Sequence, residues 1–307
     1  MIVGARRLAL VLLCSTVPTT THAQRPAPAP VNLSVTPCEY CAEWNEPQRP
    51  FRVFGNTYYV RTRGLAAIHI TSPEGHILID GALPESAPLI AAGVRALGFR
   101  LEDVKVLLNS HAHYDHAGGL AALERASGAQ VLLHPWSARV MRRGSGLIDD
   151  PQFGFFLPLP AVTVARELVD AEVVRVGPLA VTAHFTGGHT PGGTSFSWRA
   201  CEEDRCWDIV YADSQSPIAD TTFRFSGGTR YPTVLQDYAN AWRRFETVPC
   251  DVLLTPHPGL ASTFERLAQR DAGDRAAFRD PTACRAYAET SRQRLDARLQ
   301  QERSGRP

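Results

Sequence analysis

The chain has 307 residues, of which 44% are hydrophobic and 21% are charged, and its formal net charge is +1. This composition is typical of a soluble globular protein, and the near-neutral charge gives no electrostatic basis for binding nucleic acid or an anionic membrane. The length allows one large domain or two small ones. Because no Pro/Gly/Ser-rich linker and no internal repeat interrupts the middle of the chain, one domain is expected.

The first residues have the pattern of an export signal. Two arginines precede an apolar run that begins at Leu8, and Thr21-His22-Ala23 offers a small-residue cleavage site. The apolar run is far shorter than the ~20 residues that a membrane-spanning helix needs. We therefore expect a signal peptide over 1–23, a flexible mature N-terminus over 24–37, and a single domain over 38–307. In a bacterium, the exported protein would lie in the periplasm, with no membrane attachment in its mature form.

Export makes disulfides the expected state of the cysteines. The chain has 7 Cys, and Cys14 would leave with the signal peptide, so an even number remains. Cys201 and Cys206 flank a polar turn between apparent strands, which favours a bridge that closes a hairpin. Cys250 and Cys284 would then join the approach to a late strand to a C-terminal helical region.

Cys38 and Cys41 enclose only two residues. We prefer a small local disulfide for this pair, although a Cys-x-x-Cys unit can also be half of a structural zinc site or a redox pair. No second cysteine pair has the spacing of a structural zinc site, and no βαβ pattern surrounds this one.

From residue 51 onward, hydrophobic patterns predict strands interrupted by helices. Strands are expected over 52–60 with a turn at Gly55-Asn56, and over 65–71, 76–80, 104–108, 130–134, 173–176, 179–185, 194–198, 208–211 and 252–254. Helices are expected over 86–97, from Gly119 to about Ala126, near 233–245, and through most of the region after the last strand. Two halves, each with strands and peripheral helices, predict an α/β sandwich with layers in the order helix, sheet, sheet, helix.

The stretch 110–119, Ser-His-Ala-His-Tyr-Asp-His-Ala-Gly-Gly, is the clearest candidate site. It places three of the chain's 10 His and one Asp between His111 and His116. It follows the strand expected over 104–108, and open α/β sheets place their ligand sites at the carboxyl ends of strands. A solvated polar loop would explain the polarity but not this crowding of zinc-ligand types, so a metal site is expected.

Three further polar turns follow expected strands. His189 lies in a glycine-rich turn over 186–193, which allows backbone to approach an ion closely, and His257 lies between two prolines. The third turn, 212–216, contains Asp213. A lone His is more often structural than a ligand, but the shared position at strand ends favours ligand roles here. The other histidines lack such settings and are expected to be structural or surface residues: His22, His69, His76, His134 and His184. Of these, His184 is close enough to His189 in sequence to be a less favoured alternative ligand.

Together these motifs resemble the metallo-β-lactamase superfamily. They are His-x-His-x-Asp-His at 111–116, Gly-Gly-His-Thr-Pro-Gly-Gly at 187–193 and Thr-Pro-His-Pro-Gly at 255–259. Finer features resemble class B β-lactamases of the third subclass, which has Ser where the first subclass has a zinc-ligating Cys. These features are Trp44-Asn45, 55–60, 111–119, 211–216 and the Cys250/Cys284 pair. The resemblance covers nearly all of the mature chain, whereas the first His cluster alone indicates only the superfamily.

The resemblance implies an αββα sandwich with two zinc ions in the groove between the sheet edges. The first zinc would be bound by His111, His113 and His189, and the second by Asp115, His116 and His257. Paired metals about 3.5–4 Å apart share a hydroxide, and the pKa of zinc-bound water falls to about 7. This bridging hydroxide would attack the β-lactam carbonyl, with Asp115 orienting it.

Other residues would serve the substrate. Ser214 or Ser216, or both, would hydrogen-bond the substrate carboxylate, and the stretch 144–160, with its three phenylalanines, resembles the flexible loop beside the groove. The alternative, purely structural interpretation of that stretch is a surface loop packed by its own aromatic rings. The expected protein is a monomeric enzyme that hydrolyses penicillins, cephalosporins and carbapenems and so confers β-lactam resistance.

Two alternatives remain open. The first keeps the fold but changes the substrate, giving a lactonase, a glyoxalase-II-like thioesterase or a phosphodiesterase. Those relatives usually place a metal-bridging Asp where this chain has Asp213-Ser214. The alignment puts Ser214 at the ligand position, and a shift of one residue would put Asp213 there, pointing the opposite way. The second alternative is a non-catalytic zinc-binding exported protein.

Overall fold

A computed structural model of the chain describes residues 1–2, 38–60 and 62–305. The expected signal peptide over 1–23 and mature N-terminus over 24–37 therefore lie outside the described residues, apart from Met1 and Ile2. The described residues from 38 to 305 belong to one compact unit. Among the described helices, none is both long and apolar enough to span a bilayer.

The first sheet contains seven strands whose spatial order follows the chain. They are β1(Phe51–Phe54), β2(Thr57–Tyr59), β3(Ile68–Ile70), β4(His76–Ile79), β5(Val104–Leu108), β6(Gln130–Leu133) and β7(Val164–Glu167). Neighbours from β1 to β4 pair antiparallel, and those from β4 to β7 pair parallel. Parallel neighbours need crossover connections, which are supplied by α2(Ala87–Ala96), α4(Leu120–Ser127) and α5(Pro135–Arg143).

The second sheet contains five strands in the spatial order β12-β11-β10-β9-β8. In chain order these are β8(Val173–Val176), β9(Leu179–Phe185), β10(Thr194–Glu202), β11(Arg205–Tyr211) and β12(Val252–Leu254). All neighbours pair antiparallel except β11 and β12, which are parallel and are connected through α6(Val234–Thr247).

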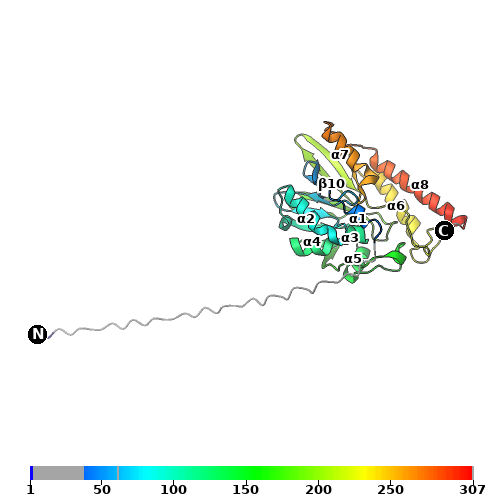
Figure 1. Cartoon of the computed structure of the whole chain (residues 1–307), viewed down its shortest axis with the longest axis horizontal. Helices are drawn as coiled ribbons and strands as arrows, with labels where there is room; N and C mark the ends of the chain where they lie inside the picture. The colour runs from blue at the N-terminus through cyan, green and yellow to red at the C-terminus, as the bar shows by residue number, and fades with distance from the viewer. Residues whose placement is uncertain (3–37, 61, 306–307) are drawn as a thin grey trace. The chain divides into compact units, whose positions relative to one another are not determined.

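The remaining helices are short, apart from two at the C-terminus. They are α1(Cys41–Trp44), η1(Pro84–Ser86), η2(Leu101–Asp103), α3(Tyr114–Ala117), η3(Phe153–Phe155), η4(Pro258–Ala261), α7(Thr263–Asp271) and α8(Ala283–Arg303). The last, α8, runs beside α6 at the edge of the molecule (Figure 1).

Apolar side chains from both sheets fill the space between them. Ile77 from the first sheet and Phe196 from the second are fully buried in this core. Phe54 stacks on Trp207 across the gap, with ring centroids 3.8 Å apart, and Trp198 Nε1 donates to the hydroxyl of Thr57 at 2.9 Å. Burying one side chain of this size stabilises the fold by about 1.5–3 kcal/mol, so this shared core holds the two sheets face to face.

Helices cover the outer faces of both sheets. Ile90 of α2 and Leu120 of α4 pack with Leu107 of the first sheet, whereas Phe245 of α6 and Tyr287 of α8 pack with the second. Figure 1 shows α2 and α4 together on one side and α6 and α8 on the other. The layers therefore run helix, sheet, sheet, helix, and the expected αββα class is confirmed.

Most expected elements are present, whereas β7 and α5 are elements that the sequence patterns did not predict, each for its own physical reason. Strands β5, β8, β9 and β12 have the expected bounds, while β10 and β11 extend further toward their hairpin turn. The edge strand β7 was not expected because its side chains are largely exposed and show no apolar alternation. Helix α5 was not expected because its N-cap is His134, whose Nδ1 accepts the Trp136 N–H at 3.0 Å, rather than Ser, Thr, Asp or Asn.

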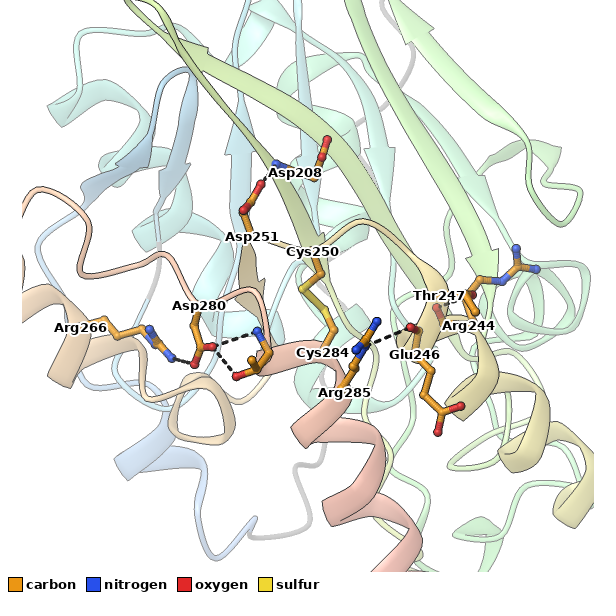
Figure 2. Close-up of a disulfide and its surroundings, with 11 residues drawn as sticks. Asp208, Arg244, Glu246, Thr247, Cys250, Asp251, Arg266, Asp280, Cys284 and Arg285 are labelled. Atoms are coloured by element: carbon orange, nitrogen blue, oxygen red, sulfur yellow. Dashed lines mark hydrogen bonds and ion pairs between the residues drawn. A yellow bond between two sulfur atoms is a disulfide. The ribbon is translucent and has the colours of Figure 1, made fainter.

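Disulfides in the described part of the chain join Cys38 to Cys41, Cys201 to Cys206 and Cys250 to Cys284, the expected pairs. Figure 2 shows the last of these, which links the turn before β12 to the first turn of α8. Polar contacts surround it. Asp251 accepts the backbone N–H of Asp208 at 3.1 Å, and Arg266 pairs with Asp280 at 2.9 Å.

Candidate metal centre

The first cluster of candidate ligands leaves the carboxyl end of β5. His113 is the N-cap of α3, and this short helix carries Asp115 and His116. The helix lies against the segment after β4, where Gly81 N donates to His116 O at 2.8 Å. A side chain at Gly119 would collide with the Gly81 carbonyl, so the glycine permits this close approach.

The second sheet supplies the other two candidate ligands. His189 lies in the turn between β9 and β10, and this turn is joined to the first cluster because Thr194 N donates to Ser110 O at 2.8 Å. His257 lies in the turn that follows β12, and Thr255 Oγ1 donates to its carbonyl at 2.7 Å. Segments about 75 and 145 positions from the first cluster by residue number therefore meet it at one edge of the sandwich, as expected for strand ends in an α/β fold.

These residues form two adjoining groups. His111, His113 and His189 are buried and offer ligand atoms that all lie within 4.8 Å of one another. The same limit holds for the second group, Asp115, His116 and His257. Asp115 Oδ2 lies 3.0 Å from His116 Nε2 and 3.3 Å from His257 Nε2. The groups are adjacent, because the rings of His111 and His116 have centroids 4.4 Å apart.

Each histidine of the first group has one ring nitrogen held by an oxygen. His111 Nδ1 lies 2.7 Å from Asp213 Oδ1 and His113 Nε2 lies 3.1 Å from Asp150 Oδ2. His189 Nδ1 donates to a backbone carbonyl, Ser216 O, at 2.7 Å. Metal-binding histidines usually have such an outer partner, which fixes the tautomer and points the other nitrogen at the ion.

Two buried ring nitrogens of the candidate ligands have no hydrogen-bond partner in the described part of the chain. They are His111 Nε2 and His116 Nδ1, and both are buried. An unpaired buried polar atom is costly, and a metal ion at His111 Nε2 would satisfy that atom. Five imidazoles and one carboxylate, with an unsatisfied inner nitrogen on His111, form a donor set that fits zinc.

Electrostatics favour the protonation states that bind metal. Burial lowers the pKa of His189 to about 3, and burial followed by the nearby His116 and His113 holds the pKa of His111 well below 6.5. Burial acts to raise the pKa of Asp115, but His116 and His257 hold it well below its usual range. Neutral His111 and His189 imidazoles therefore lie beside an ionised carboxylate at neutral pH.

His113 differs from the other two histidines of its group. Burial acts to lower its pKa, but the Asp150 carboxylate beside Nε2 acts in the opposite direction, and the pKa is raised overall. Asp150 is itself completely buried. This carboxylate is therefore placed to hold a proton on the nitrogen of His113 that faces away from its group.

A buried carboxylate anchors the start of the first cluster. Asp80, in a left-handed backbone conformation with φ of 66°, accepts hydrogen bonds from Asn109 Nδ2 and from both the N–H and the hydroxyl of Ser110, at 2.7–2.8 Å. Tyr211 OH, from the second sheet, donates to the same carboxylate at 2.7 Å. Asp80 thus ties the segment before His111 to both sheets.

The segment 213–216 lies beside the first group. Asp213 stands behind His111 and belongs to neither group of candidate ligands. Ser214 Oγ is buried and has no hydrogen-bond partner among the described residues, whereas Ser216 contributes its carbonyl to His189. This geometry places the Asp213 carboxylate as a partner of a histidine, whereas the sequence motifs suggested only a metal-bridging role for it.

The loop between α5 and β7 contributes two residues that no sequence motif marks. Asp150 contacts His113, and Gln152 Nε2 lies 3.2 Å from His189 Nε2. Phe153 and Phe155 of the same loop are 39% and 51% exposed. The only sequence signal for Asp150 was its position in the stretch 144–160, which was already expected beside the groove.

The other described histidines have partners elsewhere. His184 Nε2 lies 2.7 Å from Ser197 Oγ and is in neither group, and His69 Nε2 lies 3.0 Å from His76 Nδ1. His134 caps α5 through its Nδ1. His69, His76, His134 and His184 are therefore in neither group of candidate ligands.

Comparisons with known proteins agree with this geometry. A family model described as "Metallo-beta-lactamase superfamily" matches residues 52–257. The Rm3 metallo-beta-lactamase superposes with a TM-score of 0.85 and 48% identity, covering 87% of this chain and 100% of that chain. MEM-A1, a subclass B3 metallo-beta-lactamase from a soil metagenome library, gives a TM-score of 0.84 and 48% identity over 86% of this chain and 100% of that chain.

More distant similarity is found among curated proteins. A hydroxyacylglutathione hydrolase of Anaeromyxobacter dehalogenans is 36% identical over 123 residues, which are 39% of this chain and 37% of that enzyme. The chain spans less than half the length of the curated relatives that it matches.

Proposed function

Since the chain belongs to the metallo-beta-lactamase superfamily, and within it to the subclass B3 enzymes, we propose that it is a zinc-dependent hydrolase that opens the β-lactam ring of penicillins, cephalosporins and carbapenems. The observation that carries this proposal is the pair of adjoining three-residue groups in a fold shared with MEM-A1 over nearly the whole of that enzyme. An organism that makes the protein would resist these antibiotics.

The cofactor is zinc, two ions per chain. In this proposal His111, His113 and His189 hold the first ion, and Asp115, His116 and His257 hold the second. Held there, zinc would lower the pKa of a bound water to about 7 and polarise a carbonyl group, which is the chemistry that hydrolysis at neutral pH needs without a Ser or Cys nucleophile. The unpaired Nε2 of His111 and the low pKa values of His111 and His189 support the assignment.

Asp115 is the catalytic residue that we propose from the chain itself. Its carboxylate is ionised, because the adjacent His116 and His257 hold its pKa well below the usual range. An ionised oxygen can accept a hydrogen bond from the attacking water and so direct the water's lone pair toward the carbonyl carbon. Asp115 would in this way combine ligation with orientation of the nucleophile.

Ser214 and Ser216 are the residues that we propose for the substrate carboxylate. Ser214 Oγ has no hydrogen-bond partner among the described residues, and Ser216 is joined to His189 through its carbonyl. Helix α8 holds the segment in place. Tyr287 OH donates to Asp213 O at 2.9 Å, and Ser291 Oγ donates to Gln215 O at 3.0 Å. A rigid backbone here lets the serine hydroxyls meet the carboxylate at low entropic cost.

Two other functions are less well supported. The thioesterase alternative corresponds to the hydroxyacylglutathione hydrolases, but the one named above aligns with only 39% of this chain. Asp213, which would have to join the ligands for the metal-bridging role expected there, contacts His111 instead. A purely structural zinc site needs only four closed ligands, whereas this edge of the sandwich gathers six candidate donors.

We also propose that the protein is exported to the periplasm and acts there as a monomer on small β-lactam molecules, with no nucleic acid or membrane partner. The signal-like pattern over 1–23 and the disulfides support an oxidising compartment. Cell fractionation and sedimentation of the purified protein test localisation and assembly separately.

The decisive test of the function is hydrolysis by the purified, zinc-loaded protein of a carbapenem, a penicillin and an acyl-homoserine lactone, with and without a chelator. We expect both β-lactams to be opened and the activity to disappear with the chelator. Turnover of the lactone without turnover of the β-lactams would overturn the substrate assignment. Hydrolysis that persists in the chelator would overturn the zinc mechanism.

The ligand assignment has its own test. His189→Ala should remove the zinc of the first group, because it deletes one of three donors, whereas His184→Ala should leave the metal content unchanged because His184 contacts Ser197. Metal analysis after dialysis distinguishes the two variants. Equal zinc content in both would contradict the choice of His189.

A further inference from the structure

Arg230, in the segment between β11 and α6, contacts the loop that carries Asp150. Its Nε donates to Ile148 O at 2.6 Å, and its Nη2 donates to Asp150 O, also at 2.6 Å. The same Nη2 lies 3.1 Å from Asp220 Oδ2, and the guanidinium carbon lies 5.3 Å from the Phe223 ring centroid. One largely buried side chain thus joins the loop to a second segment. We call Arg230 and Asp220 together the Arg230 clamp.

Asp220 provides the other half of this clamp. Its Oδ2 accepts the Gly154 N–H at 2.9 Å, and its own N–H donates to Pro151 O at 2.8 Å. Its Oδ1 accepts the N–H and the hydroxyl of Thr222 at 2.8 and 2.6 Å. Burial acts to raise the pKa of Asp220, but Arg230 and Thr222 hold it below its usual range, so the carboxylate stays ionised. The loop is therefore bound at both ends of the stretch 148–154.

The loop carries its contacts into the candidate metal centre. Asp150 gives its carbonyl to Arg230, while its carboxylate lies 3.1 Å from His113 Nε2. The same carboxylate accepts the Gln152 N–H at 2.7 Å, and the Gln152 side chain reaches His189 Nε2. The Arg230 clamp therefore fixes the backbone of the same short segment, 148–154, whose Asp150 and Gln152 side chains face His113 and His189.

We propose that Arg230 is a positioning residue for the first metal site. With Asp220 it fixes the loop 148–154, so that Asp150 holds His113 in the orientation that ligation requires. The inference rests on the proposed function.

The chemistry of the clamp explains why an arginine is needed. Two backbone carbonyls and one carboxylate surround the guanidinium, and its planar fork of donors satisfies all three at once. A lysine offers a single point charge that cannot reach the same three acceptors. Without the clamp a surface loop of this length gains mobility, and the contact between Asp150 and His113 is populated for less of the time.

Arg230→Gln removes the charge and the fork but keeps most of the side-chain stem. We expect its affinity for the first zinc ion to fall roughly tenfold, the lower end of the effect of losing a direct outer partner of a ligand. The Co(II)-substituted protein should show altered visible absorption, and hydrolysis at limiting zinc should fall and then recover when zinc is added in excess. Competition with a chromophoric chelator measures the affinity in the full chain.

Three further variants make the result specific. Arg244→Gln is the matched control, because it breaks a partly exposed ion pair with Asp170, 2.9 Å long, that touches neither the loop nor a ligand. It should lower the melting temperature without changing zinc affinity or the Co(II) spectrum. Arg230→Lys should give an intermediate zinc affinity. Asp220→Asn should lower zinc affinity and alter the Co(II) spectrum as Arg230→Gln does. If the Arg230→Gln variant does not fold, Asp220→Asn serves as the test in its place.

Wild-type zinc affinity and an unchanged Co(II) spectrum in Asp220→Asn, or in folded Arg230→Gln, would overturn the inference, since the clamp would then be only structural. The proposed function fails by a different result. If the wild-type chain binds two zinc ions but does not open a carbapenem, the hydrolase assignment is wrong, while the zinc titrations still decide whether Arg230 positions the site.

Discussion

Residues behind the ligands determine the geometry of this site as much as the ligands themselves. Asp213 holds His111, Asp150 holds His113, and the Ser216 carbonyl holds His189. Each of these partners belongs to a different loop from the histidine that it orients. The ring of each histidine of the first group is thus fixed by a second segment of chain before any metal binds.

Asp213→Ala should lower the affinity of the first group for zinc by about 10–100-fold, because His111 Nδ1 loses the acceptor that fixes its ring. Asp213→Asn keeps an acceptor oxygen at the same position and should lose less. Zinc competition titrations of the two variants at neutral pH measure the difference. If the alanine variant bound zinc as tightly as the wild type, Asp213 would have no orienting role.

The sequence predicts the six candidate ligands but not their partners, and the reason is distance along the chain. Four of the ligands occupy one stretch, 111–116, where the excess of histidine is visible by inspection. The contact between His111 and Asp213 joins residues 102 positions apart, and that between His113 and Asp150 joins residues 37 apart. No local pattern marks such an aspartate, because its role depends on which loop folds beside it.

At the scale of elements, α8 acts as a support for the segment 213–216. Tyr287 and Ser291 of this helix bind the carbonyls of Asp213 and Gln215, and the helix begins at a disulfide (Figure 2). The sequence predicted helices in this region and the Cys250–Cys284 link. It did not indicate which loop the helix would hold, since that depends on the face that α8 presents to the second sheet.

Replacing both Cys250 and Cys284 by Ser should lower the free energy of unfolding by about 2–4 kcal/mol, because the link closes a loop of 34 residues in the unfolded chain. It should also raise KM for β-lactams more than it lowers kcat, since the segment 213–216 loses part of its support. Urea unfolding and steady-state kinetics measure the two effects.

The matched control is the pair Cys201 and Cys206, which closes a hairpin with a sequence separation of only 5. Replacing these residues by Ser should cost less stability and leave KM unchanged, because the hairpin turn contacts no candidate ligand or substrate residue. A KM increase of the same size in both double variants would argue against a specific role of α8.

At the scale of the whole molecule, several histidines outside the metal centre are buried or half-buried as neutral bases. Burial lowers the pKa of His69 to about 3 and those of His134 and His184 to about 4. In the unfolded chain the pKa of histidine is about 6.5. Between these values the unfolded state binds more protons than the folded state, so stability is greatest above about pH 6.5 and is lost as the pH falls toward 4.

Each such histidine should contribute a slope of up to about 1.4 kcal/mol per pH unit over this window. His184→Gln removes one titrating base while keeping a polar group opposite Ser197, so its stability should vary less steeply with pH than that of the wild type. Urea midpoints of the chelated proteins between pH 4 and 7 give both slopes. Identical slopes would mean that His184 is not neutral in the folded protein.

The division of the ligands between the two sheets bears on the order of folding. Each group takes two residues from the cluster after β5 and its third from a turn of the other sheet, so neither half of the chain contains a complete group. Complete groups therefore exist only once the apolar faces have met, and zinc capture follows docking of the sheets. Bound zinc then acts mainly on the unfolding rate, because it holds the two sheets together after they have docked. Removing zinc should therefore speed unfolding more than it slows folding.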